Sequence, residues 1–394
     1  MNQQFEQIID RKNTRAAKWD LVKQLYGSED VLPMWVADMD FQAPEAVTSA
    51  LSKRAEHGIF GYTMTDKEIN KAVTDWLSYK HEWEIHNSWL LYSPGVITTL
   101  HMAIQTLTEK GDKVMIQTPV YPPFYQIVNI HERQLVKNQL QLVDGKYEID
   151  FEDMENQFKK GVKAFILCNP HNPVGRVWTR TELEKMISLC LKYNVYILAD
   201  EIHADLVYEP NKHIPIASLN DAVLQQSVTC MSPTKTFNLA GLQVSYAVIP
   251  NKEIRKSMEE RFHMQGIHGL NTMGIVALEA AYNEGKQWLT NLSEQLKVNL
   301  DYVTSSLEQR DDISVIKPEG TYLVWLDFRA LNLSQDELRK FLQEKAKIGL
   351  NDGITFGDEG TGFMRINIAT PLELVKEGIQ RLIAALDERK KEEE

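Results

Sequence analysis

The chain has 394 residues, with 43 lysines and arginines against 55 aspartates and glutamates, which gives a net charge of −12. Apolar residues make up 43% of the chain and charged residues 25%, as in globular proteins, so disordered and fibrous proteins are excluded. The acidic balance argues against a nucleic-acid partner, because phosphate backbones bind basic surfaces. At about 100–200 residues per domain, this length predicts two or three domains, or one large and one smaller domain.

The cysteines and the hydropathy pattern indicate the compartment. Cys168, Cys190 and Cys230 show no CxxC spacing, so we expect neither a disulfide framework nor a zinc knuckle. Free thiols are typical of a reducing compartment, and the N-terminal residues lack the apolar run of a signal peptide. No stretch reaches the ~18 apolar residues of a membrane span. We therefore expect a cytoplasmic protein with no membrane partner.

Helical and β-rich segments alternate through the first two thirds of the chain. Ser93-Pro94-Gly95 leads into a helical stretch at 97–107. Five β-rich runs follow, at 113–117, 164–168, 195–199, 228–231 and 244–249. These runs are almost continuously apolar, which predicts strands buried on both faces of a sheet.

Thr179 and Glu182 predict the start of a helix between two of these strands. They form a capping box, in which the hydroxyl and the carboxylate bind free backbone N–H groups of the first turn. Apolar residues then recur at helical spacing, at Leu183, Met186, Ile187, Cys190 and Leu191. The order strand, helix, strand predicts an α/β domain with a mostly parallel sheet flanked by helices.

The last hundred residues show a different pattern. A long helical stretch at 288–307 precedes a β-rich run at 321–326, a helix, a second β-rich run at 362–368 and a closing helix. This order predicts a smaller α+β domain. We expect an N-terminal segment that contributes to the small domain, a large domain and a small C-terminal domain, at residues 1–48, 49–286 and 287–394.

Polar segments follow three of the predicted strands directly. They are Asn169-Pro-His-Asn-Pro-Val-Gly175, Asp200-Glu-Ile-His203 and Ser232-Pro-Thr-Lys235. Ligands of open α/β sheets bind outside the carboxyl ends of the strands, so these segments should meet at one edge. The helix that starts after Gly95 adds free N–H groups, which bind phosphates well.

A lysine, a buried acid and an anion site together favour one cofactor, pyridoxal 5′-phosphate. It requires a lysine that binds it covalently, an acid beside the pyridine nitrogen and a cradle for its phosphate. Ordinary roles stay open for each residue: a surface lysine, a turn-forming asparagine, a tyrosine packed in a loop, an arginine in an ion pair or a core histidine. Glu201, His203 and Asp205 would also share one face of a strand, but no fourth ligand lies nearby, so we expect no metal site.

The three segments resemble, in order and spacing, the signatures of class I/II aminotransferase-like enzymes, which use pyridoxal phosphate and have the fold-type I architecture. The segments CNPHNPVGRVW and DEIHADL are more similar to those of the MalY/PatB-type cystathionine β-lyases than to those of ordinary aminotransferases. The resemblance extends from about Asp38 to Arg365. It implies a large α/β domain with a mostly parallel sheet and a smaller α+β domain.

The resemblance also implies roles around the cofactor ring. Lys235 would carry the cofactor and move the α-proton of the substrate. Asp200 would pair with the pyridine nitrogen, and Asn172 would bind the ring hydroxyl. Tyr121 would stack on the ring, and it is also our candidate for the general acid. His203 stands where aminotransferases usually have a tyrosine that contacts the ring hydroxyl.

The phosphate would bind the N–H groups of Val96 and Ile97 and the hydroxyl of Ser232, by the same resemblance. Many relatives have an additional phosphate-binding arginine at the position of Gln243. Its replacement here, like the histidine at position 203, favours the lyase branch. Tyr62 matches a tyrosine that reaches the cofactor of the other subunit, which implies a homodimer with a shared site.

Arg365 would bind the α-carboxylate of the substrate, and Ala37 would line the substrate pocket. The resemblance therefore implies an α,β-elimination of L-cystathionine, or of a related cysteine conjugate, to pyruvate, ammonia and a thiol, which is homocysteine for cystathionine. An aminotransferase is the alternative within the same cofactor class. A regulatory protein that keeps the cofactor as a ligand is a third hypothesis, but it would not need both Lys235 and Arg365.

Overall fold

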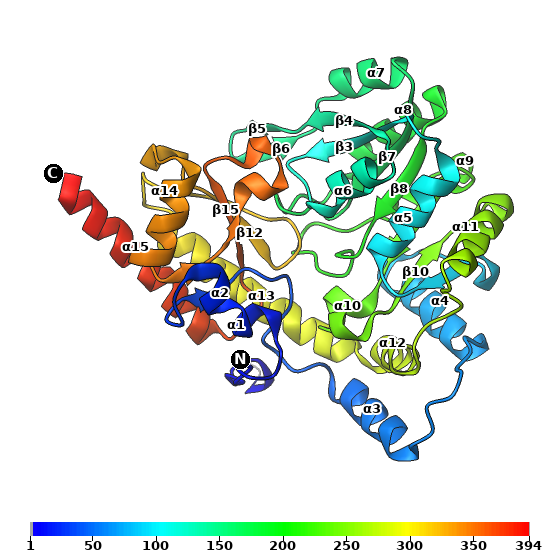
Figure 1. The fold of residues 1–394 in the computed structure, drawn as a ribbon, viewed down its shortest axis with the longest axis horizontal. Helices are drawn as coiled ribbons and strands as arrows, with labels where there is room; N and C mark the ends of the chain where they lie inside the picture. Colours follow the sequence, from blue (N-terminus) through cyan, green and yellow to red (C-terminus); the bar gives the residue numbers. More distant parts are fainter. Residues whose placement is uncertain (1–2, 394) are drawn as a thin grey trace.

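A seven-stranded sheet forms the centre of the larger part of the molecule, shown in Figure 1 as a computed structural model that describes residues 3–393. Its strands lie in the order β2-β10-β9-β8-β7-β3-β4, and β10 alone runs antiparallel to its neighbours. Their bounds are β2 Leu90–Ser93, β3 Lys113–Thr118, β4 Gln134–Gln139, β7 Val162–Cys168, β8 Tyr196–Asp200, β9 Ser227–Met231 and β10 Ser245–Val248. The mostly parallel sheet is confirmed.

Helices cover both faces of this sheet, which explains the continuously apolar strands. In β7, Ala164 and Ile166 pack in a cluster with α5, α6 and α11, whereas Phe165 and Leu167 pack with α7 and α8. The helices of the first face are α5 Val96–Leu107, α6 Pro123–Ile130 and α11 Lys252–Met264. Those of the second face are α7 Phe151–Lys159 and α8 Arg180–Tyr193, where Thr179 and Glu182 form the predicted capping box.

The C-terminal part contains a four-stranded antiparallel sheet in the order β11-β12-β15-β14. Its strands are β11 Ser314–Ile316, β12 Leu323–Asp327, β14 Asn351–Asp352 and β15 Phe363–Asn367. The helices of this part are α13 Lys286–Leu307, α14 Gln335–Lys340 and α15 Leu372–Glu393. The long helix and the two strands that the sequence predicted here lie within two residues of their expected bounds, and the two helices predicted without bounds are present.

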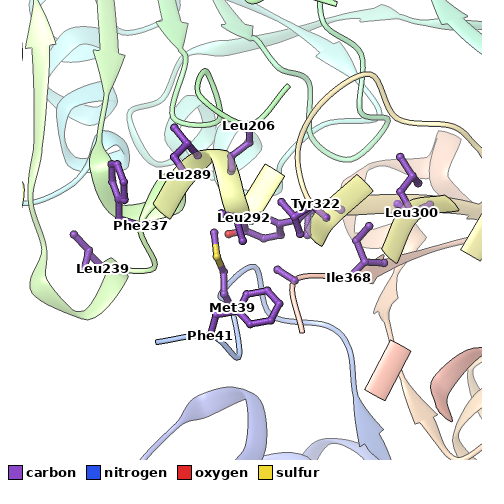
Figure 2. Packing of buried hydrophobic residues seen from close by; sticks show 14 of the residues in the cluster. Met39, Phe41, Leu206, Phe237, Leu239, Leu289, Leu292, Leu300, Tyr322 and Ile368 are labelled. Carbon is purple, nitrogen blue, oxygen red and sulfur yellow. The ribbon is translucent and has the colours of Figure 1, made fainter. Parts of the chain in front are cut away.

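The N-terminal segment packs against the C-terminal part. Strand β1 (Leu32–Pro33) pairs in parallel with β13 (Ile348–Gly349). Figure 2 shows Met39 and Phe41 beside Leu292 of α13 and Tyr322, within one buried apolar cluster. The division at residues 48 and 286 stays a prediction; residue 48 lies within α3 (Glu45–His57), and residue 286 begins α13.

Six further α-helices and one β-hairpin complete the described α-helices and strands. They are α1 Ala17–Asp20, α2 Val22–Tyr26, α4 Lys67–His81, α9 Asp221–Leu224, α10 Pro233–Thr236, α12 Thr272–Glu284 and the hairpin of β5 Gln141–Val143 with β6 Lys146–Glu148. Between residues 3 and 393, no helix is both long and apolar enough to cross a membrane.

Candidate active site

The sheet topology brings the predicted site segments to one edge. The parallel strands β3, β7, β8 and β9 end at this edge. Strand β2 also ends there, because β10 is antiparallel to both β2 and β9, so β2 and β9 run in the same direction. The antiparallel β10 begins at the same edge. The segments that follow these strands, together with the start of α5, therefore surround one site, as open α/β sheets predict.

Lys235 lies in α10, the short helix after β9, and its Nζ donates a hydrogen bond to the carbonyl oxygen of Ala37 at 2.6 Å. Burial lowers the pKa of Lys235 to about 8; the positive charge of Arg365 adds to this shift, whereas Asp38 and Asp200 oppose it. A larger fraction of this amine is therefore neutral near pH 7 than for an exposed lysine. A neutral amine can act as nucleophile and as base.

Asp200 is the last residue of β8, in register with Cys168 of β7 and Cys230 of β9. Both cysteines are buried, so they add little polarity beside the carboxylate. Its Oδ1 accepts a hydrogen bond from the Ile202 N–H at 3.2 Å. Burial raises the pKa of Asp200 to about 7, with opposing effects from this hydrogen bond and from Lys235. A protonated ring nitrogen at this position would stabilise the carboxylate.

Arg365 binds the asparagine of the segment after β7. Its Nη1 donates to Oδ1 of Asn172 at 2.8 Å, and its Nη2 donates to the carbonyl of Trp35 at 3.1 Å and to Asn351. A guanidinium has five N–H groups, and Nε has no hydrogen-bond partner among residues 3–393. Burial lowers the pKa of Arg365 to about 10, far enough above neutral for it to stay charged. It can therefore bind a carboxylate.

A segment around Ala37 joins the two parts of the molecule at the site. The carbonyl of Ala37 accepts the hydrogen bond from Lys235 and a second one from the hydroxyl of Tyr322, at 2.9 Å. Asn367 of β15 donates to the carbonyl of Asp38 at 2.6 Å. The chain next to Lys235 is thus fixed by two side chains of the C-terminal part. They are Asn367 of the four-stranded sheet and Tyr322, the residue before β12.

Tyr121 lies half-buried after β3. Burial raises the pKa of Tyr121, the negative charge of Asp200 adds to the shift, and Arg365 opposes it. The phenol therefore keeps its proton at neutral pH, as a general acid requires.

His203 is buried in the turn after β8, and burial lowers its pKa to about 3, with the charges of Lys235 and Arg365 adding to the effect. The ring is therefore neutral at pH 7. Its Nδ1 has no hydrogen-bond partner in the part of the chain that the structure describes. A neutral imidazole with one unpaired nitrogen can bond the hydroxyl of a cofactor ring.

The expectation that Glu201, His203 and Asp205 share a strand face is wrong. Strand β8 ends at Asp200, and the chain then forms two consecutive turns. The Ala204 N–H donates to the Glu201 carbonyl and the Leu206 N–H donates to the His203 carbonyl, each at 2.9 Å. The two carboxylates bond different histidines: Glu201 bonds His213 at 2.8 Å, and Asp205 bonds His81 at 2.9 Å.

The first turn of α5 and the start of α10 form the predicted phosphate end. Gly95 precedes α5 and offers no side chain to the N–H groups of Val96 and Ile97. Ser232 caps α10 by accepting the Thr234 N–H at 3.0 Å, and its hydroxyl donates to the Val244 carbonyl at 2.7 Å. Gln243 lies exposed just before β10, at the same edge.

Tyr62 lies apart from the other predicted residues. It belongs to the loop between α3 and α4, and its side chain is fully exposed. The structure of one chain thus brings together all the predicted site residues except this one, which the resemblance assigns to the site of a partner subunit.

Tyr322, Asn351 and Asn367 contact the site, although none of them was predicted from the sequence. Tyr322 lies within a predicted strand, where an aromatic residue usually serves the core. Asn367 lies within another predicted strand, at 362–368, and is the last residue of β15. Their partners lie 14 to 331 positions away in the chain, so no local motif identifies them.

These residues fit pyridoxal phosphate. A half-buried lysine with a lowered pKa and a buried carboxylate with a raised pKa could hold its carbonyl carbon and its pyridine nitrogen. The N–H groups at the start of α5 could hold the phosphate. The unpaired Nδ1 of His203 and the amide of Asn172 could hold the ring hydroxyl.

Comparisons with known proteins agree with this geometry. The family model "Aminotransferase class I and II" matches residues 29–382. A cystathionine β-lyase, PatB of Bacillus subtilis (strain 168), is 44% identical over 97% of this chain and 99% of its own length. The structure of cystalysin from Treponema denticola, which contains pyridoxal 5′-phosphate, matches with a TM-score of 0.94, 35% identity and 98% of both chains.

A third relative is the pyridoxal-phosphate-bound C–S lyase of Staphylococcus hominis. It matches with a TM-score of 0.90 and 32% identity over 98% of each chain. These similarities confirm the resemblance and the fold predicted from the three segments. The chain belongs to the aminotransferase class I and II family.

Proposed function

We propose that this chain is a pyridoxal-phosphate-dependent carbon–sulfur lyase that acts on L-cystathionine and related cysteine conjugates. With water, cystathionine would give homocysteine, pyruvate and ammonia, after the bond between the β-carbon and sulfur breaks. The observation that carries the proposal is Lys235, a half-buried lysine whose pKa is lowered to about 8 and on which the charges of Arg365 and Asp200 both act. The relatives named cystathionine β-lyase and C–S lyase support the same reaction class.

Arg365 would bind and orient the substrate. A guanidinium suits the two oxygens of an α-carboxylate, and a bidentate contact would fix the amino acid in one orientation. The Trp35 carbonyl and the Asn172 and Asn351 side chains hold the guanidinium in place. The α-hydrogen can then face Lys235.

Lys235 would remove the α-proton of the substrate with its neutral amine. Bound pyridoxal phosphate supplies an aldehyde for the substrate amine and a ring that takes up the electrons released at the α-carbon. Asp200 would keep a proton at the pyridine nitrogen. Tyr121 would donate its phenolic proton to the departing sulfur, because its raised pKa keeps that proton in place at neutral pH.

The experiment that tests the proposal measures product release from L-cystathionine without any keto acid. The lyase predicts continuous formation of pyruvate, whereas an aminotransferase turns over only after 2-oxoglutarate is added. Turnover that depends on 2-oxoglutarate would contradict the proposal and support the aminotransferase. No turnover of either kind, with the cofactor bound, would support the regulatory ligand-binding protein.

The enzyme would act as a homodimer in the cytoplasm. The loop that carries Tyr62 also exposes Ile59, Phe60 and Met64, and a partner subunit would cover such an apolar group. Three free, buried cysteines are compatible with a reducing compartment.

A further inference from the structure

The backbone of residues 35–39 lies beside Lys235 and is held by side chains along its whole length. Each carbonyl of this segment accepts a hydrogen bond from a side chain. At its end, the Met39 N–H donates to Oδ1 of Asn238 at 3.0 Å, and the amide of Asn238 donates back to the Met39 carbonyl at 3.0 Å. The position of the segment relative to Lys235 therefore depends on several elements at once.

Four charged side chains form a cluster on this segment, which we call the N-terminal charge cluster: Arg11, Lys18, Asp38 and Asp40. Nη2 of Arg11 lies 2.7 Å from Oδ2 of Asp38, and its Nη1 lies 2.7 Å from Oδ1 of Asp40. Nζ of Lys18 lies 2.6 Å from the other oxygen of Asp40. Two positive and two negative charges meet here, so the cluster is neutral as a whole.

The Lys18–Asp40 pair is the buried part of the cluster, with side chains that are 1% and 3% exposed. The indole of Trp19 donates to Asp40 at 2.8 Å, and the indole of Trp35 donates to the Lys18 carbonyl at 3.2 Å. Loss of hydration offsets much of the attraction within a buried ion pair, so such a pair adds little stability by itself. Its consequence here is positional, because it ties the N-terminal residues to the segment beside Lys235.

Asp38 is the member of the cluster whose charge acts on Lys235. The carbonyl just before Asp38 accepts the hydrogen bond from the Lys235 amine. The titratable and charged groups around this amine come from different elements: Arg365, Asp38, Asp200, His203 and Tyr322. Burial and the charge of Arg365 lower the pKa of Lys235, and the charges of Asp38 and Asp200 oppose them. Burial lowers the pKa of His203 and raises that of Tyr322, so both are neutral at pH 7.

We propose that Arg11 is a positioning residue of the active site, which neutralises Asp38 and thereby keeps the Lys235 amine reactive near neutral pH. Nη1 and Nη2 of Arg11 donate to the two oxygens of Asp38, at 3.2 Å and 2.7 Å, which fixes the carboxylate and offsets its charge. Without Arg11, the cluster would carry one net negative charge beside the amine. The inference rests on the proposed role of Lys235 as the residue that captures the cofactor.

The pH dependence of covalent pyridoxal phosphate capture by the full-length, cofactor-free chain tests this role, because capture requires the neutral amine. Arg11→Gln should raise the midpoint of the capture rate by roughly 0.5–1 pH unit, since it leaves Asp38 uncompensated. Asp38→Asn breaks the same contact but should lower the midpoint, because it removes the negative charge. A merely structural role would shift both variants in the same direction, and that result, or no shift in either, would overturn the proposal.

Further variants separate charge from structure. Arg11→Gln with Asp38→Asn removes one charge of each sign, so its midpoint should return to the wild-type value; a midpoint outside the range of the two single variants would overturn the proposal. Arg11→Lys keeps the charge and should also stay close to the wild type. If Arg11→Gln does not fold, Asp38→Asn decides alone, and a midpoint that fails to fall would overturn the proposal.

Arg310→Gln is the matched control. Arg310 pairs with Asp312 through two similar contacts, at 2.8 Å and 2.7 Å, and its partners lie outside the site. Its loss should leave the capture midpoint unchanged, and a shift equal to that of Arg11→Gln would overturn the proposal.

Lys235→Ala separates this inference from the assignment of the lysine, and this variant should capture no cofactor. If it captures none while the Arg11 and Asp38 variants keep the wild-type midpoint, the role of Arg11 is overturned and that of Lys235 stands. Covalent capture by Lys235→Ala would overturn both.

Discussion

Lys235 and Asp200 have pKa values shifted in opposite directions by the same cause, the loss of water around a charged group. Burial lowers the pKa of Lys235 to about 8 and raises that of Asp200 to about 7. Both shifts disfavour the charged forms and so oppose folding of the cofactor-free chain at neutral pH. A bound cofactor would supply partners for both groups.

Asp200→Asn should stabilise the cofactor-free protein at pH 8. The folded-state pKa of about 7 lies above the ordinary 3.8, so the folded protein binds more protons than the unfolded chain between these values. The free energy of unfolding therefore falls as the pH rises through this window. Above pH 7 the carboxylate is ionised in both states, so the free energy has fallen by its full amount. A shift of one pKa unit corresponds to about 1.4 kcal/mol, so the free energy of unfolding of the variant should be higher by on the order of 2–4 kcal/mol at pH 8.

Urea unfolding at pH 8 and pH 4 measures this gain, which should largely vanish at pH 4. Asp311→Asn is the matched control, because that side chain is 86% exposed and its loss should change stability little. A destabilised Asp200 variant at pH 8 would contradict the account of this carboxylate.

The pH profile of cofactor capture tests Lys235. The cofactor-free protein should capture pyridoxal phosphate covalently at a rate that rises with pH up to about 8, since only the neutral amine reacts. Visible absorbance follows the capture. Arg365→Met should move the profile to higher pH, because it removes a positive charge that lowers the pKa. A wild-type capture rate that still rises as the pH approaches 10.5 would mean that Lys235 has the pKa of an ordinary lysine. Covalent capture of the cofactor by Lys235→Ala would exclude Lys235 as the residue that binds it.

At the scale of elements, the turn after β7 depends on close contact with the C-terminal part. Gly175 has φ +73°, and its carbonyl accepts the N–H groups of Glu319 at 2.7 Å and Gly320 at 3.0 Å. A Cβ at this position would lie 2.4 Å from Cβ of Pro318. The glycine therefore allows the segment with Asn172 to approach the loop before β12.

Gly175→Ala should destabilise the protein by about 2–5 kcal/mol, the sum of an unfavourable backbone conformation and an overpacked contact. Gly161 provides the control, with φ +89° and open space around a built Cβ, so Gly161→Ala should cost only about 1–2 kcal/mol. Urea midpoints of both variants measure the difference. Equal losses would contradict the close-contact argument.

The strands and the residues that follow them could be predicted because their signals are local. The continuous apolar run at 164–168 and the capping box at Thr179 both report on the nearest residues of the chain. The Ala37 carbonyl between Lys235 and Tyr322 could not be predicted in the same way, since its partners are 198 and 285 positions distant. The turn at 201–205 was missed because its alternating charges also fit a strand.

At the scale of the whole molecule, a shared active site predicts complementation between two inactive variants. Lys235→Ala removes the catalytic amine of one subunit, and Tyr62→Ala removes the tyrosine that would serve the other. A mixed dimer contains one site with both residues intact, so lyase activity should return when the two proteins are unfolded and refolded together. No recovery, with mixed dimers demonstrated, would contradict a site shared through Tyr62.

The product balance from L-cystathionine tests the central claim most directly. Pyruvate, homocysteine and ammonia should be released in equal amounts over many turnovers without a keto acid, and Lys235→Ala should release none. A keto acid that still contains the sulfur and both carbon chains, formed only in the presence of 2-oxoglutarate, would contradict the account.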